Sequence, residues 1–188
     1  MNVATRVSLL ALALLVACKS GSDAPAAAAA NTRSIPDGKT PSALVSAVDS
    51  ATLASMEMRK GEWKEADASS QWRAWVANGK VRVIEEFMAV GDYSARKLMH
   101  YYTDDEKLAA HLETRDQLVF AGDRPPVREQ MTLTLEFQGN SATKSSKIVN
   151  NVEKSVEPFE VETAKSHGEV LLAAAKSAAA VTPTPAKP

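Results

Sequence analysis

The side chains of this chain that commonly do chemistry are few and scattered. The 188 residues include three histidines, His100, His111 and His167, and one cysteine, Cys18. The spacing of the histidines matches no recognised metal-ligand motif, and neither a second cysteine nor a paired carboxylate accompanies them. We therefore expect surface histidines and no metal site.

Neighbouring carboxylates are a second candidate for chemistry. Glu85 and Glu86 are adjacent, so in a strand their side chains point to opposite faces and cannot act together as acid and base. Asp104, Asp105 and Glu106 are more typical of a solvated turn than of a calcium loop, which needs alternating ligands and a glycine. Neither a G-x-S-x-G sequence nor a glycine-rich phosphate loop occurs, and we expect no enzymatic activity.

The one cysteine follows an apolar segment close to the first residue. Arg6 precedes an apolar run, Val7 to Ala17, of roughly 11 residues. This length suits the hydrophobic region of a secretory signal and is well below the ~20 residues that span a bilayer. The segment therefore predicts a targeting signal.

Residues Leu15, Val16, Ala17 and Cys18 resemble the lipobox of bacterial lipoproteins. The resemblance implies cleavage between Ala17 and Cys18, attachment of diacylglycerol to the Cys18 thiol, and N-acylation of the new terminus by a chain such as palmitate. Several chains are needed because, at ~0.8 kcal/mol per buried methylene, one chain binds a membrane only reversibly. Lys19 in place of aspartate resembles an outer-membrane sorting signal. The expected protein is anchored in the outer membrane of a bacterial envelope, faces the periplasm, and carries no cofactor besides these lipids.

The chain divides into four segments. Residues 1–17 are the expected signal peptide. Residues 18–40 are the lipidated cysteine and a flexible tether, because a sequence rich in Ala, Ser, Gly and Pro cannot bury enough apolar surface to become ordered. Such a tether has a root-mean-square span of about 25 Å. Residues 41–180 are expected to form one domain, and residues 181–188 a disordered, proline-rich tail.

Charge and cysteine content restrict the partners and the means of stabilisation. The 22 Lys and Arg residues are interspersed among 23 Asp and Glu residues, so we expect no basic patch for nucleic acid. Internal disulfides are excluded because Cys18 is the only cysteine. The domain must therefore rely on an apolar core.

Apolar periodicity predicts an α+β fold. One amphipathic helix is expected over about 41–58, ending near Gly61, and a second from Pro158, where proline suits the first turn. Between them, three hairpins predict a six-stranded antiparallel β-meander whose inner face is covered by both helices. A β-sandwich or a closed barrel fits this pattern less well.

The hairpin turns are expected at Asn78-Gly79, at residues 103–106 and at Gly139-Asn140. The first turn places Val76 opposite Val81, and by extension Ala74 opposite Val83 and Trp72 opposite Glu85. The second places Tyr101 beside Leu108, and Leu98 opposite His111 with His100 on the same face. A helix over 104–116 is the alternative to this second hairpin. Residues 127–138 follow a period-two pattern in which Val127, Met131, Leu133, Leu135 and Phe137 alternate with polar residues, and a more polar strand over about 142–150 is expected at the sheet edge.

Trp75 supplies a candidate partner-binding patch. On the expected register it points away from the apolar face, together with Arg73, Arg82 and Ile84. An exposed tryptophan beside arginines is typical of a recognition surface. The alternative is that a terminal helix covers Trp75.

These observations favour a membrane-anchored binding or scaffolding module in the periplasm. Its partners would be the membrane, through the lipid anchor, and an envelope protein or peptidoglycan. A periplasmic enzyme inhibitor of the lysozyme-inhibitor kind is one alternative, although such inhibitors commonly rely on disulfides. A hydrolase with catalytic residues that no motif marks is the other.

Overall fold

The computed structural model describes residues 45–181 of the chain. Cys18 with the lipobox, the expected tether, the start of the first expected helix and residues 182–188 lie outside this range. The signal peptide, the cleavage and the lipidation therefore stay predictions. No helix among the described residues is long and apolar enough to cross a membrane.

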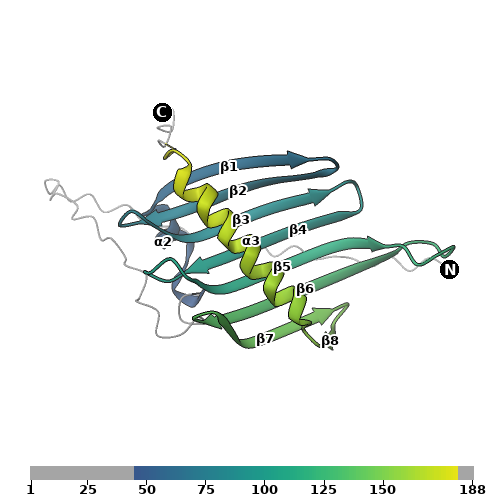
Figure 1. Ribbon diagram of the computed structural model, residues 1–188. Coiled ribbons are helices and arrows are strands. Elements are labelled where there is room, and N and C mark those ends of the chain that lie inside the picture. Colours follow the sequence, from purple (N-terminus) through teal and green to yellow (C-terminus); the bar gives the residue numbers. More distant parts are fainter. Residues whose placement is uncertain (1–44, 182–188) are drawn as a thin grey trace, which may run out of the picture. The chain divides into compact units, whose positions relative to one another are not determined.

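Eight strands form one antiparallel sheet, and each strand pairs with the next along the chain (Figure 1). This confirms the α+β class and the antiparallel meander, and it corrects the number of strands from six to eight. The strands are β1 (Glu57–Glu65), β2 (Ala68–Ala77), β3 (Lys80–Val90), β4 (Ser94–Tyr102), β5 (Leu108–Val119), β6 (Val127–Gln138), β7 (Ser141–Val149) and β8 (Val152–Lys154).

The two strands that the sequence did not predict lie at the two ends of the sheet. β1 contains Gly61, which was expected to end a helix and instead pairs with Trp72. A Cβ at position 61 would lie 2.3 Å from Trp72 Cζ2, so glycine is needed there to make room for the indole ring. β8 follows a turn in which Asn150 and Asn151 adopt positive φ values of 49° and 64°. β7 is therefore not the edge strand.

The first expected helix is interrupted and ends earlier than expected, since residues 45–47 are helical but residues 48 and 49 are not. α2 spans Ser50–Ala54, with Asp49 as its N-cap and Ser55 as its C-cap. The Asp49 carboxylate accepts a hydrogen bond from Thr52 N at 2.7 Å, which satisfies one free amide of the first turn. Residues from Glu57 onward are strand, so the predicted helix over 41–58 is wrong at this end.

The C-terminal helix begins where it was predicted. α3 spans Pro158–Ser177, and Glu157 and Glu160 form a capping box at its start. Its buried positions repeat at helical spacing: Ala164, Gly168, Leu171 and Ala175. This stripe fixes which side of α3 faces the sheet.

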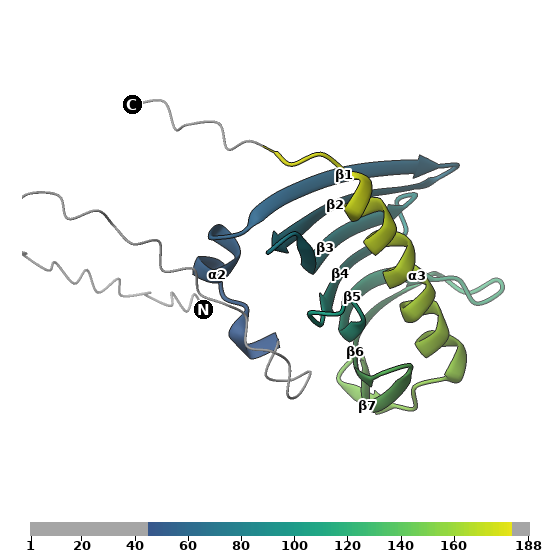
Figure 2. The ribbon, with the colours of Figure 1, turned by 60° about the vertical axis from the view of Figure 1, so that its left-hand side comes forward.

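The two helices pack on opposite faces of the sheet (Figure 2). On the face covered by α3, called here the α3 face, Leu171 and Ala175 pack in one cluster with Ile84 and Tyr102. On the opposite face, the segment that contains α2 packs against a second cluster. That cluster includes Val83, Tyr101 and Ala110, with Val45, Val48 and Leu53. Both helices were expected on one face, and this expectation is wrong.

A β-bulge shifts the register of the β2–β3 hairpin. Val76 pairs with Val81 as predicted, and Asn78 and Gly79 form the turn with positive φ values of 53° and 75°. The register shifts between Trp75 and Val76, so Ala74 pairs with Ile84 rather than Val83. A bulge inserts one unpaired residue, which exchanges the faces of all following partners.

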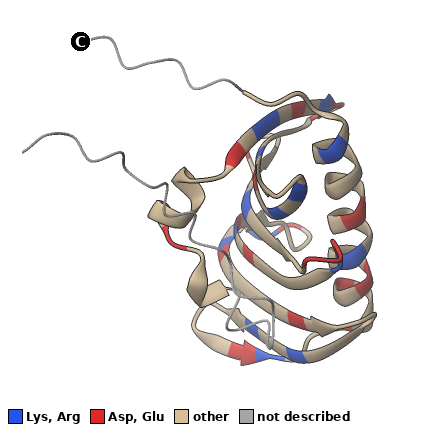
Figure 3. Cartoon of the chain, turned by 90° about the vertical axis from the view of Figure 1, so that its left-hand side faces the viewer, with Lys and Arg blue, Asp and Glu red and all other residues tan. Residues whose placement is uncertain are grey.

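The β4–β5 hairpin is also confirmed, and the alternative helix over 104–116 is wrong. Its register differs from the prediction by two residues on one strand, again with a bulge, between Tyr101 and Tyr102. His100 therefore pairs directly with His111, and Leu98 pairs with Glu113. Acidic and basic residues are intermixed along the strands and α3, as the sequence indicated (Figure 3).

Candidate functional site

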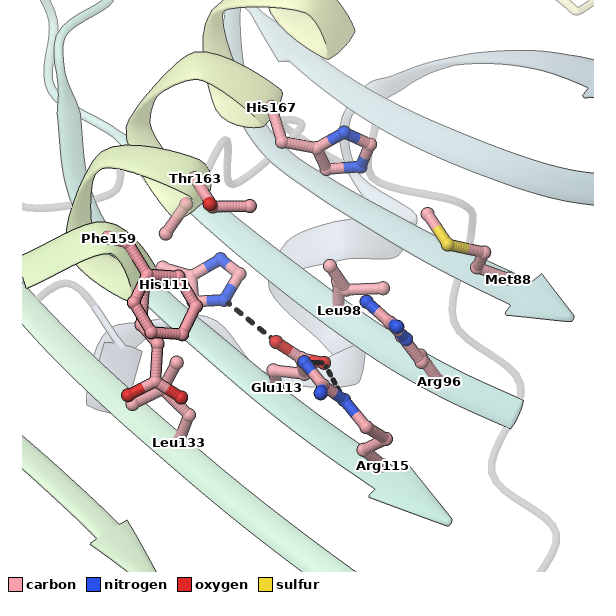
Figure 4. Close-up of a pocket in the computed structure, with 12 residues that line it drawn as sticks. Met88, Arg96, Leu98, His111, Glu113, Arg115, Leu133, Phe159, Thr163 and His167 are labelled. Atoms are coloured by element: carbon pink, nitrogen blue, oxygen red, sulfur yellow. Dashed lines mark hydrogen bonds and ion pairs between the residues drawn. The ribbon is translucent and has the colours of Figure 1, made fainter. Parts of the chain in front are cut away.

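A cavity of about 360 Å³ lies between α3 and the sheet (Figure 4). This volume is at the lower end of the range of ~300–1,000 Å³ that is typical of ligand sites. Met88, Leu98, Leu133 and Phe159 supply an apolar lining. The charged residues Arg96, Glu113 and Arg115 line the same cavity.

The strand register explains why polar side chains converge beneath α3. Residues that pair directly across β3 to β6 form rows on the α3 face, and three neighbouring rows contain histidine, glutamate and arginine in turn. The first row is Ile84, His100, His111 and Leu135; the second is Glu86, Leu98, Glu113 and Leu133; the third is Met88, Arg96, Arg115 and Met131.

Glu113 is the negative charge of the cavity. It is 6% exposed, Arg115 lies 2.7 Å from its Oε1, and His111 Nε2 lies 3.7 Å from its Oε2. Burial alone would raise the pKa of this carboxyl, but the neighbouring His111 and the charge of Arg115 outweigh burial and lower the pKa to about 2. Glu113 is therefore ionised at any physiological pH, and Arg115 neutralises it.

Arg96 is a positive charge that lacks such a partner. Its Nε is buried and has no hydrogen-bond partner among residues 45–181, and no ion pair to it occurs within that range. Arg115, its cross-strand neighbour, repels it, and burial together with this repulsion lowers the pKa of Arg96 despite the attraction of Glu113. The cavity thus presents to a ligand the guanidinium of Arg96, which forms no ion pair with the described residues.

Glu86 is fully buried beside the cavity and joins α3 to the sheet. Its Oε1 accepts hydrogen bonds from Ser70 Oγ and, at 3.3 Å, from Trp63 Nε1. Its Oε2 accepts a hydrogen bond of 2.5 Å from His167 Nε2 on α3. Burial raises the pKa of Glu86, but the hydrogen bonds from His167 and Ser70 outweigh it, so the pKa is lowered.

The Ser70, Glu86 and His167 group is not a catalytic triad. In such a triad the imidazole lies between the hydroxyl and the carboxylate, so that it can take the hydroxyl proton. Here the Glu86 carboxylate lies between the other two side chains. The Ser70 hydroxyl donates a hydrogen bond to Glu86 and makes none to His167. Ser70 is also buried. The arrangement activates no nucleophile.

The expectation of surface histidines is wrong for two of the three. His100 and His111 are 0% and 1% exposed, and their ring centroids are 4.8 Å apart. Burial, with the adjacent His111 and His167, holds the pKa of His100 well below its usual range, so its ring is neutral. His167 is partly exposed on α3, beside the buried Gly168, and lines the cavity.

The four residues of the predicted partner-binding patch do not share one surface. Ile84 is fully buried on the α3 face. Arg82 is buried, donates a hydrogen bond to Tyr102 O at 3.2 Å, and forms an ion pair with Asp104. Only Trp75 and Arg73 come together, with the guanidinium 5.9 Å from the indole ring.

Trp75 lies on the opposite face of the sheet, where it packs in the cluster with Val45, Val48 and Leu53. The stated alternative was a terminal helix over Trp75, and Leu53 of α2 packs against this same cluster. The bulge beside Trp75, which no turn signal in the sequence indicates, separates it from Ile84.

Sequence reasoning missed the cavity itself. The available signal was two polar residues, Glu86 and His100, at strand positions whose neighbours two residues away are apolar. Such residues must face the core if their neighbours do.

Comparisons with protein-family models, curated proteins and solved structures find no match. The proposed function therefore rests on the side chains of the cavity alone.

Proposed function

We propose that this is a binding protein that holds a small anionic ligand with an apolar body in the cavity beneath α3. The observation that supports this best is Arg96, whose buried Nε has no partner among the described residues. A buried N–H donor without a partner is costly. A ligand carboxylate or phosphate would supply a charge-assisted hydrogen bond to this guanidinium.

The other charges of the cavity leave Arg96 as the cation available to a ligand. Arg115 is engaged with Glu113 at 2.7 Å. Glu160, at the start of α3, is engaged with Lys147 at 2.7 Å. The anion should therefore lie against Arg96.

The apolar lining defines the rest of the ligand. Met88 and Leu98 lie on the same face as Arg96, and Phe159 approaches from the helix (Figure 4). Methionine and phenylalanine side chains adapt well to alkyl chains and small rings. A short alkyl acid has the required combination of an anionic end and an apolar body.

The protein that carries this cavity is proposed to be a lipoprotein of the bacterial envelope. Residues 15–18 support this, with Cys18 as the lipidated residue and the outer membrane as the site of anchoring. The tether of residues 18–40 would hold the binding domain in the periplasm near the membrane surface. An envelope protein or peptidoglycan that receives or delivers the ligand is a further proposed partner.

Hexanoate, hexyl phosphate and hexanol test the proposed ligand class. The full chain is placed in lipid nanodiscs, and binding is measured by calorimetry against empty nanodiscs. Both anions should bind to one site, and hexanol, which has the same apolar body without charge, at least about tenfold more weakly, since a charged hydrogen bond contributes about 1.5–3 kcal/mol.

Two arginine variants locate the binding. Arg96→Met keeps the apolar volume and should reduce the affinity for hexanoate at least about tenfold. Arg128→Met is the control, because Arg128 is exposed and paired with Asp116 outside the cavity. Equal affinity in wild type and Arg96→Met, or equal binding of hexanol and hexanoate, would contradict the proposal.

Mass spectrometry of the native protein tests the anchor separately. The N-terminal peptide should begin at Cys18 and carry diacylglycerol and an amide-linked acyl chain. A peptide that retains Met1, or an unmodified Cys18 thiol, would exclude lipidation without bearing on the cavity.

A further inference from the structure

We propose that Glu86, His100 and His167 form a binding site for a late first-row divalent transition ion such as Zn²⁺. The residues come from β3, β4 and α3, and one ligand atom of each lies within 4.8 Å of the other two. This site departs from the sequence-based expectation of no metal. It does not depend on the proposed anionic ligand.

His100 is the observation that points most directly to an ion. Its side chain is 0% exposed, and neither Nδ1 nor Nε2 has a hydrogen-bond partner among the described residues. A buried polar ring without a partner is destabilising. Its neutral form presents a lone pair, which is the form that binds a metal ion. A metal ion bound by the unprotonated ring nitrogen of His100 would supply the missing partner.

Glu86 is held as carboxylate ligands in metal sites are commonly held. Ser70 and Trp63 both donate to its Oε1, which leaves Oε2 directed towards His167. Hydrogen bonds from outside the coordination sphere orient a ligand and are a common feature of metal sites. Trp63 and Ser70 pair across β1 and β2, so this support is part of the sheet itself.

The geometry requires only small movements to accept an ion. Tetrahedral ligands at ~2.0–2.1 Å from Zn²⁺ are separated by about 3.4 Å. His167 Nε2 and Glu86 Oε2 are now 2.5 Å apart, so they must separate slightly when the ion replaces the hydrogen bond. Because the three atoms lie within 4.8 Å of one another, His100 must approach by up to about 1.4 Å.

The set of two imidazoles and one carboxylate favours zinc over magnesium or calcium, which prefer oxygen ligands. Three protein ligands leave a fourth position open, as in zinc sites that bind a further molecule. His167 also lines the cavity, so this fourth position would lie near the cavity wall.

Zinc titration of the full chain tests the site. The protein is purified in mild detergent, freed of metal with a chelator, and titrated with Zn²⁺ in competition with a chromophoric chelator. One equivalent should bind. The ring-nitrogen NMR signals of His100 and His167 should shift on binding, and those of His111, which among the three ligands contacts only the His100 ring, should shift less.

Two isosteric variants form a matched pair. Glu86→Gln should weaken zinc binding at least roughly tenfold, whereas Glu113→Gln, a buried carboxylate two strands away, should leave it within about twofold. His167→Ala should also weaken binding at least roughly tenfold. This variant changes a partly exposed residue, so it remains informative if Glu86→Gln does not fold. Circular dichroism of the metal-free variants checks folding.

Failure of the wild-type chain to bind Zn²⁺ would overturn the proposal. Unchanged affinity in His167→Ala would do the same, because the bound ion would then lie elsewhere. An equal loss of affinity in Glu113→Gln and Glu86→Gln would also overturn it, since it would show a general effect of buried charge rather than coordination.

Discussion

Glu86 and Glu113 occupy similar positions on the α3 face but are neutralised in different ways. Both are buried on inner strands of the sheet, Glu86 on β3 and Glu113 on β5, and each lies beside a histidine. Glu113 is paired with Arg115 from its own strand, two residues away. Glu86 has no arginine or lysine partner among the described residues and is bound by neutral donors and by His167 from α3.

Glu113 forms an ion pair within one strand, whereas the contact between Glu86 and His167 joins the sheet to α3. The charge on Glu113 is compensated within β5, so that pair exists wherever the strand is folded. Glu86 obtains its last partner only when α3 docks on the sheet. The same carboxylate therefore fixes the helix over the cavity and remains able to bind a cation, whereas Glu113 sets the charge of the cavity floor.

Of the two carboxylates, Glu86 should have the larger effect on the free energy of unfolding when it is removed. Glu86→Ala leaves Ser70, Trp63 and His167 without their common acceptor, and breaking a buried pair from one side costs about 3–5 kcal/mol. Urea unfolding measures the change. The control is Glu85→Ala on the opposite face: its partners Arg73 and Lys97 are about half exposed, so it should cost about 1 kcal/mol or less. Equal costs would show that α3 does not depend on Glu86.

Acid unfolding should report Glu113. Its pKa is about 2 in the folded protein and 4.5 in the reference state, so its ionised form stabilises the fold above pH 4.5. This contribution, on the order of 3 kcal/mol, is lost as the pH falls from 4.5 towards 2. Glu113→Gln should remove this part of the pH dependence. A wild-type unfolding free energy that changes no more steeply than that of the variant over this range would contradict the assignment.

Local sequence patterns correctly predicted those structural features whose signal lies within one element or one turn. Alternation over 127–138 predicted β6, Pro158 predicted the start of α3, and Asn78-Gly79 predicted a turn. These signals reflect backbone preferences and a single buried face, which do not depend on the rest of the chain.

The site depends on information of another kind. Bulges after Trp75 and Tyr101 change the pairing partners, and no residue type in the sequence marks either. Gly61 resembled a helix end, although it is a strand residue that accommodates Trp72. His167 joins the site only through the packing of α3, 81 positions away from Glu86 in the sequence. Registers and helix docking are decided by tertiary packing, so the cluster could not be assembled from spacing.

Gly168 should give the smallest effect, and its sign tests how closely α3 approaches His100. Glycine inside a helix costs about 1 kcal/mol relative to alanine. A Cβ at position 168 would lie 3.1 Å from His100 Nδ1 and 3.4 Å from Leu108 Cδ2. Overpacking of this kind costs about 1–3 kcal/mol, so Gly168→Ala should be destabilising by about 1 kcal/mol despite its better helix propensity.

A double-mutant cycle separates the two contributions to this change. In a His100→Ala background the crowding is relieved, so Gly168→Ala should become stabilising by about 1 kcal/mol, which is the helix propensity alone. The exposed Ala173→Gly calibrates that propensity in the same helix and should cost about the same amount. If Gly168→Ala were stabilising in both backgrounds, the helix would have room to move away from His100. The hydrogen bond from Tyr102 Oη to Gly168 O, 2.8 Å long, opposes that movement, because it holds the helix backbone against β4 at this residue.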